Sequence, residues 1–129
     1  MAEEPTWVVA SVVLAIHDEQ IAEHGGGAGV RDETLLESAL ARPKNLFGYE
    51  AAGLAQLAGA YAFGICKNHP FVDGNKRTSL VVAELFLALN GQRLDATDVE
   101  CVMVWQKLAA GEIDEPSLAL WFDQHIAPV

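Results

Sequence analysis

The sequence predicts an all-α protein, a compact bundle of about six helices joined by short loops. Apolar residues recur at helical spacing through most of the chain. Capping residues, prolines and glycines divide these segments from one another. No stretch of four or more residues alternates as a strand does, and residues 92–94 are the one short piece with an extended pattern. The 129 residues suit a single domain over 1–129, long enough to bury a core.

The first two helices are bounded by capping residues and by glycine or proline. Thr6 can cap a helix that runs to about His24, where three glycines follow. Its apolar stripe consists of Val9, Val12, Val13, Ile16 and Ile21. Asp32 can cap the second helix, which we expect to stop before Pro43, because helical geometry is disfavoured at the residue before a proline.

The connection over residues 43–50 has turn residues at both ends and three large apolar side chains. Two interpretations stay open: a loop pinned to the core by these side chains, or a flap that docks a substrate. The helix that follows, over 51–68, is rich in Ala and Leu and contains Gly53, Gly59 and Gly64. Because small residues let another helix approach, we expect this to be the central buried helix.

Three more helices are predicted in the second half. Gly74 and Asn75 open a largely apolar helix that runs to Asn90, and Gly91 terminates it. Asp95 opens a helix over 98–110. Its expected core face consists of Val99, Val102, Met103 and Leu108. A last helix begins at Asp114 and Pro116.

The charge and composition exclude several classes of function. A net charge of −10 and a pI near 4.6 argue against direct binding of nucleic acid or of an anionic membrane. The N-terminus lacks the positive region of a signal peptide, and the apolar run over 7–16 is too short to span a bilayer. We therefore expect a cytoplasmic protein. Cys66 and Cys101 lie in apolar segments and are expected to be reduced and buried, and His17 and His24 to be packing or surface residues rather than metal ligands.

The candidate functional stretch is His69 to Thr78, HPFVDGNKRT. Lys76 and Arg77 fall in the first turn of a helix, where the dipole already makes the potential positive and disfavours cations by about 0.3–1 kcal/mol. A bound polyanion would reverse this penalty. Backbone amides at a helix start, reinforced by Lys and Arg, form a phosphate site.

Two further residues of this stretch suit a reaction on a nucleotide. Asp73 offers hard oxygen ligands for the Mg²⁺ that accompanies nucleotide phosphates. The imidazole of His69 can take a proton from a hydroxyl. A Walker A loop does not fit, because the first glycine and the preceding strand are missing. A purely structural helix–turn–helix junction, with Asp73 as a cap, leaves the two cations unexplained.

The run from His69 to Arg77 resembles the signature of the Fic/Doc superfamily, H-x-F-x-D/E-G-N-G/K-R. The resemblance covers about residues 16–95. An Ile-His near the start, the glycine-rich turn, RDETLLESAL and FLALNG are similar to the death-on-curing (Doc) toxins of bacterial toxin–antitoxin pairs.

The resemblance implies an all-α core whose motif loop binds ATP and Mg²⁺. It implies His69 as the general base on a target hydroxyl, Phe71 as the buried anchor of the loop and Asp73 as the Mg²⁺ ligand. Gly74 and Asn75 would supply backbone and side-chain hydrogen bonds to phosphate, and Lys76 and Arg77 the cations. Lys67 is a weaker candidate for a phosphate or substrate contact.

Lys76 is the position that discriminates between branches. Adenylyltransferases of the Fic branch usually carry glycine there and a second arginine three residues after Arg77, where this chain has Leu80. In both positions, Lys76 and Leu80, the sequence resembles the Doc branch. That branch implies transfer of the γ-phosphate to a threonine of elongation factor Tu, arrest of translation, and neutralisation by an antitoxin of the Phd type. AMP transfer by the same site and a non-catalytic helical binding module remain alternatives.

Overall fold

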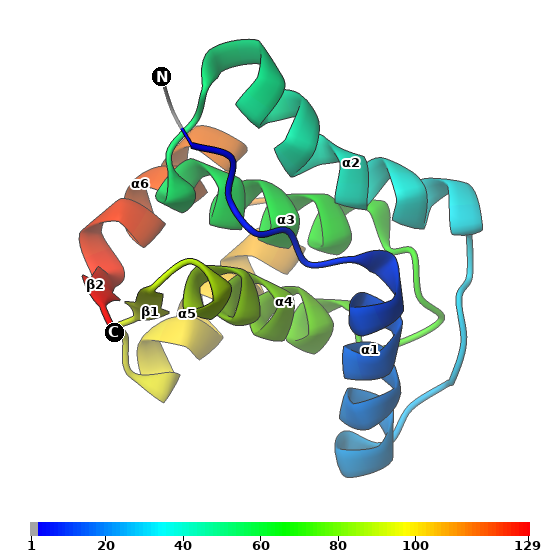
Figure 1. Cartoon of the computed structure of the whole chain (residues 1–129). Coiled ribbons are helices and arrows are strands. Elements are labelled where there is room, and N and C mark those ends of the chain that lie inside the picture. The colour runs from blue at the N-terminus through cyan, green and yellow to red at the C-terminus, as the bar shows by residue number, and fades with distance from the viewer. Residues whose placement is uncertain (1–2) are drawn as a thin grey trace.

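The computed structural model describes residues 3–129, and within them the chain forms six helices and one two-stranded sheet (Figure 1). The all-α prediction is confirmed, since helices make up most of these residues. In chain order the elements are α1 (Ala10–His24), α2 (Glu33–Glu50), α3 (Leu54–Asn68), α4 (Asn75–Leu89), β1 (Gln92–Leu94), α5 (Asp98–Ala109), α6 (Glu115–His125) and β2 (Ile126–Pro128). None of the helices in this range has the length and apolar character needed to cross a bilayer.

Helix α3 forms the centre of the fold, as the sequence predicts. It packs against α2, α4 and α6 (Figure 1), and ten of its fifteen residues are buried. A Cβ on Gly59 would lie 3.4 Å from the backbone of Ala119 in α6, and one on Gly64 would lie 3.3 Å from the backbone of Ala39 in α2. These two glycines therefore set how closely α6 and α2 approach the central helix.

Three predicted boundaries are confirmed by the local geometry. The Asp32 carboxylate accepts the backbone N–H of Leu35 over 3.0 Å at the start of α2. The Asp114 carboxylate does the same for Ser117 over 2.9 Å at the start of α6. Gly91 follows α4 with φ 78°, a conformation that favours glycine. Local side-chain chemistry decides each of these helix ends.

The predicted start of the first helix is wrong. Helix α1 begins at Ala10 rather than near Thr6. The backbone N–H and carbonyl of Thr6 bond the side chain of Asn90, over 2.8 and 2.9 Å. These two bonds join the non-helical segment before α1 to the end of α4. A partner 84 residues away therefore overrides the capping preference of threonine. Of the predicted stripe, Val13 is fully buried whereas Val9 is half-exposed.

The prediction that the second helix stops before Pro43 is also wrong. Helix α2 continues through Pro43 to Glu50. A proline inside a helix leaves the carbonyl four residues earlier without its usual N–H partner and crowds it. That carbonyl belongs to Ala39, and it lies where α3 carries Gly64 and has no side chain in the way. Because Gly64 has no side chain, this carbonyl has space beside α3, and the helix continues past Pro43.

Residues 43–50 are therefore neither a pinned loop nor a substrate flap. They form the last turns of α2. Phe47 packs edge-on against Trp7, with ring centroids 5.9 Å apart, while Tyr49 is 92% exposed. The apolar side chains of this segment serve helix packing on one face only.

The predicted core face of the fifth helix is wrong in most positions. Helix α5 buries Cys101, Trp105 and Leu108, and it exposes Val99, Val102 and Met103. Its N-cap is Thr97 rather than Asp95. Trp105 determines how α5 is rotated about its axis, because its large ring packs against α6. The ring centroids of Trp105 and Phe122 lie 5.9 Å apart. The smaller valines then lie on the solvent side.

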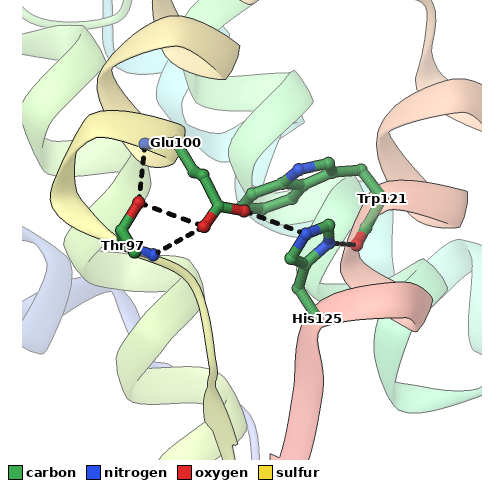
Figure 2. Close-up of polar contacts among 4 residues, drawn as sticks. All are labelled: Thr97, Glu100, Trp121 and His125. Atoms are coloured by element: carbon green, nitrogen blue, oxygen red, sulfur yellow. Dashed lines mark hydrogen bonds and ion pairs between the residues drawn. The ribbon is translucent and has the colours of Figure 1, made fainter.

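The end of α6 is bonded to the start of α5 (Figure 2). Glu100 bonds the Thr97 backbone N–H with one carboxylate oxygen, and its other oxygen lies 3.2 Å from Nε2 of His125. Nδ1 of His125 lies 2.7 Å from the carbonyl oxygen of Trp121. Strand β2 follows directly and pairs antiparallel with β1, whose extended pattern the sequence indicates. Strand β2 itself is not predicted by the sequence.

Candidate active site

The predicted functional stretch forms the turn between α3 and α4. Helix α3 ends at Asn68, its C-cap His69 has φ 48° and ψ 55°, and α4 is capped by Gly74 with φ 74°. The left-handed conformation suits Gly74 but costs a residue with a Cβ, such as His69, about 1–2 kcal/mol. The surrounding contacts must offset that cost and fix the direction of the His69 side chain.

Phe71 anchors this turn in the core. Its ring is 1% exposed and stacks on the ring of His17, with centroids 3.9 Å apart and planes 7° apart. Nε2 of His17 donates to the backbone carbonyl of Asp73 over 2.8 Å, because a carbonyl only accepts. The expectation that His17 is a packing residue is confirmed, and its packing partner is the motif loop.

The side chain of Asn75 folds back into the same turn. It accepts the Phe71 N–H through Oδ1 and donates to the Phe71 carbonyl through Nδ2, both over 3.0 Å. Nδ2 also lies 3.5 Å from Nδ1 of His69, at the limit of a hydrogen bond. Asn75 is buried. Its side chain shapes the loop, so we expect its contribution to a ligand to come from the backbone N–H.

The glycine-rich turn after α1 lies directly against Asp73. The Asp73 carboxylate accepts the N–H of Gly74 over 2.8 Å, and its other oxygen lies 3.4 Å from the N–H of Gly27. A Cβ on Gly26 would lie 2.7 Å from that carboxylate, and one on Gly27 would lie 2.8 Å from Val72. Only glycine permits this approach, so the turn is a support for the motif loop rather than a simple connection.

Arg31 is a candidate functional residue that no pattern in the sequence predicted. Its guanidinium donates to the carbonyl of His69 over 2.7 Å and to that of Asn68 over 2.9 Å. The backbone N–H groups of Arg31 and Asp32 both bond the carbonyl of Pro70. The one sequence signal was the similarity of RDETLLESAL to Doc toxins, which gave Arg31 no role.

A network of buried polar groups lies beneath the first turn of α4. Ser79 donates to the Lys76 carbonyl over 2.7 Å, accepts the indole N–H of Trp105 over 2.8 Å, and lies 3.2 Å from Sγ of Cys66. Burial raises the pKa of the Cys66 thiol. Cys66 and Cys101 are buried free thiols, as predicted. Within residues 3–129, neither Ser79 nor Cys66 is hydrogen-bonded to a base that would make it a nucleophile.

The predicted catalytic, metal-binding and phosphate-binding residues of the motif line one hollow. It has a volume of about 370 Å³ and is lined by His69, Val72, Asp73, Gly74, Asn75, Lys76, Arg77 and Ala109. Ala109 comes from α5, and no sequence signal pointed to it. Lys76 and Arg77 are exposed and form no ion pair within residues 3–129. Phe71 lies outside the lining, in the core.

Comparison with known proteins shows the family of this chain. The model of the Fic/DOC family matches residues 7–87, which include the whole motif. The chain belongs to the Fic/DOC family. Over 109 residues it is 34% identical to the protein kinase doc of Escherichia phage P1, covering 83% of this chain and 85% of that protein. Over 74 residues it is 43% identical to the toxin Doc of Mycolicibacterium smegmatis, covering 56% and 57% of the two chains. Both relatives place this Fic/DOC protein on the Doc side of the family.

Proposed function

We propose that this protein is a Doc-like toxin that transfers the γ-phosphate of ATP to a Ser or Thr hydroxyl of a protein target. The observation that carries the proposal is that Lys76 and Arg77, exposed at the start of α4, line the same hollow as His69. One relative is named a protein kinase and another a toxin, which supports both halves of the proposal.

The start of α4 has the features of a polyphosphate site. The first intrahelical bond runs from Thr78 to Gly74, which leaves the N–H groups of the preceding residues without partners inside the helix. These N–H groups, the helix dipole and two cations all favour an anion. A bound triphosphate would turn the unfavourable placement of Lys76 and Arg77 into a favourable one.

Asp73 suits Mg²⁺ bound together with such a triphosphate. Its carboxylate is held by the Gly74 N–H and borders the hollow. No cluster of three or more His, Cys, Asp or Glu occurs within residues 3–129, so a site built from protein ligands alone is not supported there. Mg²⁺ fits, because it commonly takes one or two carboxylates and completes its shell with phosphate oxygens and water. When bound, the ion would neutralise charge on the phosphates.

His69 is the group that would receive the proton. It is exposed and lines the hollow, and the one hydrogen bond of its ring within residues 3–129 is the long one to Asn75. As the hydroxyl oxygen of the target bonds to the γ-phosphorus and ADP leaves, the hydroxyl proton passes to the imidazole. Catalysis would then rest mainly on positioning and electrostatics.

Lys76 and Leu80 favour phosphate transfer over AMP transfer. A long cation where adenylyltransferases usually have glycine obstructs one pose of the triphosphate and attracts charge in another. Leu80 stands where those enzymes have a second arginine, so the far end of the triphosphate lacks this cationic contact. By resemblance, the target is elongation factor Tu in the cytoplasm, the effect is arrest of translation, and the partner is an antitoxin of the Phd type. The net charge of −10 suits a basic antitoxin segment.

The test uses ATP labelled at either the α or the γ position, with purified elongation factor Tu as acceptor. We expect label from the γ position only, and none with His69→Ala. Lys76→Gly should lower this transfer and admit some label from the α position. Label from the α position with the unaltered protein would replace the kinase proposal by AMP transfer. Growth inhibition that His69→Ala leaves unchanged in cells would favour a non-catalytic binding module.

A further inference from the structure

Three hollows follow one another across the motif. The central one, described above, shares His69 and Ala109 with a groove of about 510 Å³ between the end of α3 and the α5–α6 turn. It shares Lys76 and Arg77 with a smaller hollow of about 230 Å³ on the other side. His69 thus separates the groove from the centre, and the two cations separate the centre from the smaller hollow.

This order assigns the groove, provided that the proposed phosphate transfer is right. In-line transfer needs the acceptor oxygen and the leaving group on opposite sides of the γ-phosphorus. With the γ-phosphate at the start of α4, the acceptor must approach from the side of His69. The rest of the bound nucleotide must then extend past Lys76 and Arg77. We infer that the groove beyond His69 binds the acceptor segment of the target protein.

The chemistry of the groove agrees with a peptide and disfavours a nucleotide. Its apolar lining includes Phe63, Leu108 and Ile113, and its rim carries Glu112 and Asp114. The groove lining holds two carboxylates and one lysine, Lys67, so its net charge is negative, which disfavours a polyphosphate but not a peptide. The smaller hollow on the other side contains Leu80, Cys101, Val102 and Trp105 beside the two cations, and no carboxylate.

Glu112 is the rim carboxylate available for recognition. The Asp114 carboxylate accepts the Ser117 N–H at the start of α6, and hydrogen bonds from the Ser117 hydroxyl and then from this N–H lower the pKa of Asp114. Glu112 is exposed, and within residues 3–129 its side chain forms no hydrogen bond or ion pair, while its backbone N–H is fixed to the Lys107 carbonyl. A free carboxylate on a fixed turn selects a cation at one place along a bound chain.

The occupant is therefore an extended segment of a protein. It presents its Ser or Thr hydroxyl to His69, lays an apolar side chain against Phe63 and Ile113, and places a Lys or Arg opposite Glu112. Lys67 also lines the groove, with Nζ 5.6 Å from the centre of the Phe63 ring. Its charge therefore lies over the face of this aromatic ring.

The test is a positional library of Ser- and Thr-centred peptides, phosphorylated with γ-labelled ATP. At one position, Lys or Arg should be preferred about two- to fivefold by the wild-type protein, the range expected for one exposed ion pair. Glu112→Gln should abolish the preference, and Glu112→Lys should transfer it to Asp and Glu at the same position. Glu19→Lys on α1 is the matched control, since that carboxylate lies outside the groove lining.

The outcomes separate this inference from the proposed function. Transfer with the same preferences in Glu112→Lys as in the wild type overturns the acceptor groove and leaves the kinase in place. A lowered KM for Mg·ATP in Glu112→Lys, with peptide preferences unchanged, would assign the groove to the nucleotide instead, because the added cation would attract the phosphates. If the wild type labels no peptide, the proposed function fails for these acceptors, and binding of the labelled protein to the same peptide array decides the groove. Binding there without a basic preference overturns it.

Discussion

The guanidinium of Arg31 donates to the backbone carbonyl of His69 over 2.7 Å, and to that of Asn68 over 2.9 Å. It therefore caps the C-terminus of α3, where the helix dipole is negative, at the residue that has the strained left-handed backbone. Because the backbone of His69 determines where its imidazole can point, Arg31 is a positioning residue for the proposed base.

Replacing Arg31 should lower the rate of transfer more than the affinity for ATP. Arg31→Ala removes both bonds, and a displacement of the base by about 1 Å can cost about 100-fold in rate. Arg31→Lys keeps the charge but loses the two-pronged geometry, so we expect an intermediate kcat. Steady-state kinetics with varied ATP should show a reduced kcat and a nearly unchanged KM. A lower melting temperature with unaltered kcat would assign Arg31 a structural role alone.

Gly26→Ala should weaken the response to Mg²⁺. Gly26 has φ 117°, and its Cβ would lie 2.7 Å from the Asp73 carboxylate, so the substitution displaces that carboxylate. Gly29→Ala is the control, because Gly29 has a similar φ of 97° but no atom within 4 Å of the added Cβ. The Mg²⁺ concentration for half-maximal transfer should rise in the first variant only. An equal rise in both would mean that backbone strain, and not contact with Asp73, is responsible.

Ser79→Ala should destabilise the fold, and Thr78→Val should not. Removing the Ser79 hydroxyl leaves the Trp105 indole N–H and the Lys76 carbonyl without their buried partner, at a cost of about 1–3 kcal/mol. The neighbouring Thr78 hydroxyl is fully buried and has no partner within residues 3–129, so valine should be neutral or stabilising there. Urea unfolding followed by tryptophan fluorescence gives both free energies. A Ser79→Ala variant as stable as the wild type would show that the Ser79 network contributes little.

Acid should loosen the start of α5. Hydrogen bonds from Thr97, first from its backbone N–H and then from its hydroxyl, hold the pKa of Glu100 below its ordinary value. A carboxyl whose pKa is lowered on folding stabilises the protein above the unfolded pKa of about 4.3, and this contribution is lost as the pH falls through the folded pKa. Glu100→Gln should therefore flatten the acid limb of the stability curve. Glu112→Gln, which removes a carboxylate that caps no helix, should leave that limb steeper than Glu100→Gln does.

The sequence predicts the helices well where local chemistry decides them. Asp32, Asp114 and Gly91 act on their own backbone or on residues three or four positions away, so their signals are readable from the sequence. Thr6 and Pro43 mislead, because the deciding partners, Asn90 and Gly64, are distant along the chain. The face of α5 misleads for the same reason, since Trp105 finds its contacts in α6.

The candidate site divides in the same way. His69, Asp73 and the two cations are close in sequence and on one turn, so their meeting in one hollow follows from the motif. The supports of that turn come from elsewhere. His17 reaches it from α1, Arg31 from the segment before α2, and Ala109 from α5. No local pattern encodes these approaches.

The most direct measurement is calorimetric titration of the protein with Mg·ATP. If the start of α4 is a polyphosphate site, the wild type should bind one equivalent. Arg77→Ala should weaken binding about 10- to 100-fold, as expected for the loss of a charged hydrogen bond worth about 1.5–3 kcal/mol. Glu19→Ala on α1 should leave binding unchanged. The absence of binding to the wild type, even with a protein acceptor present, would contradict the account.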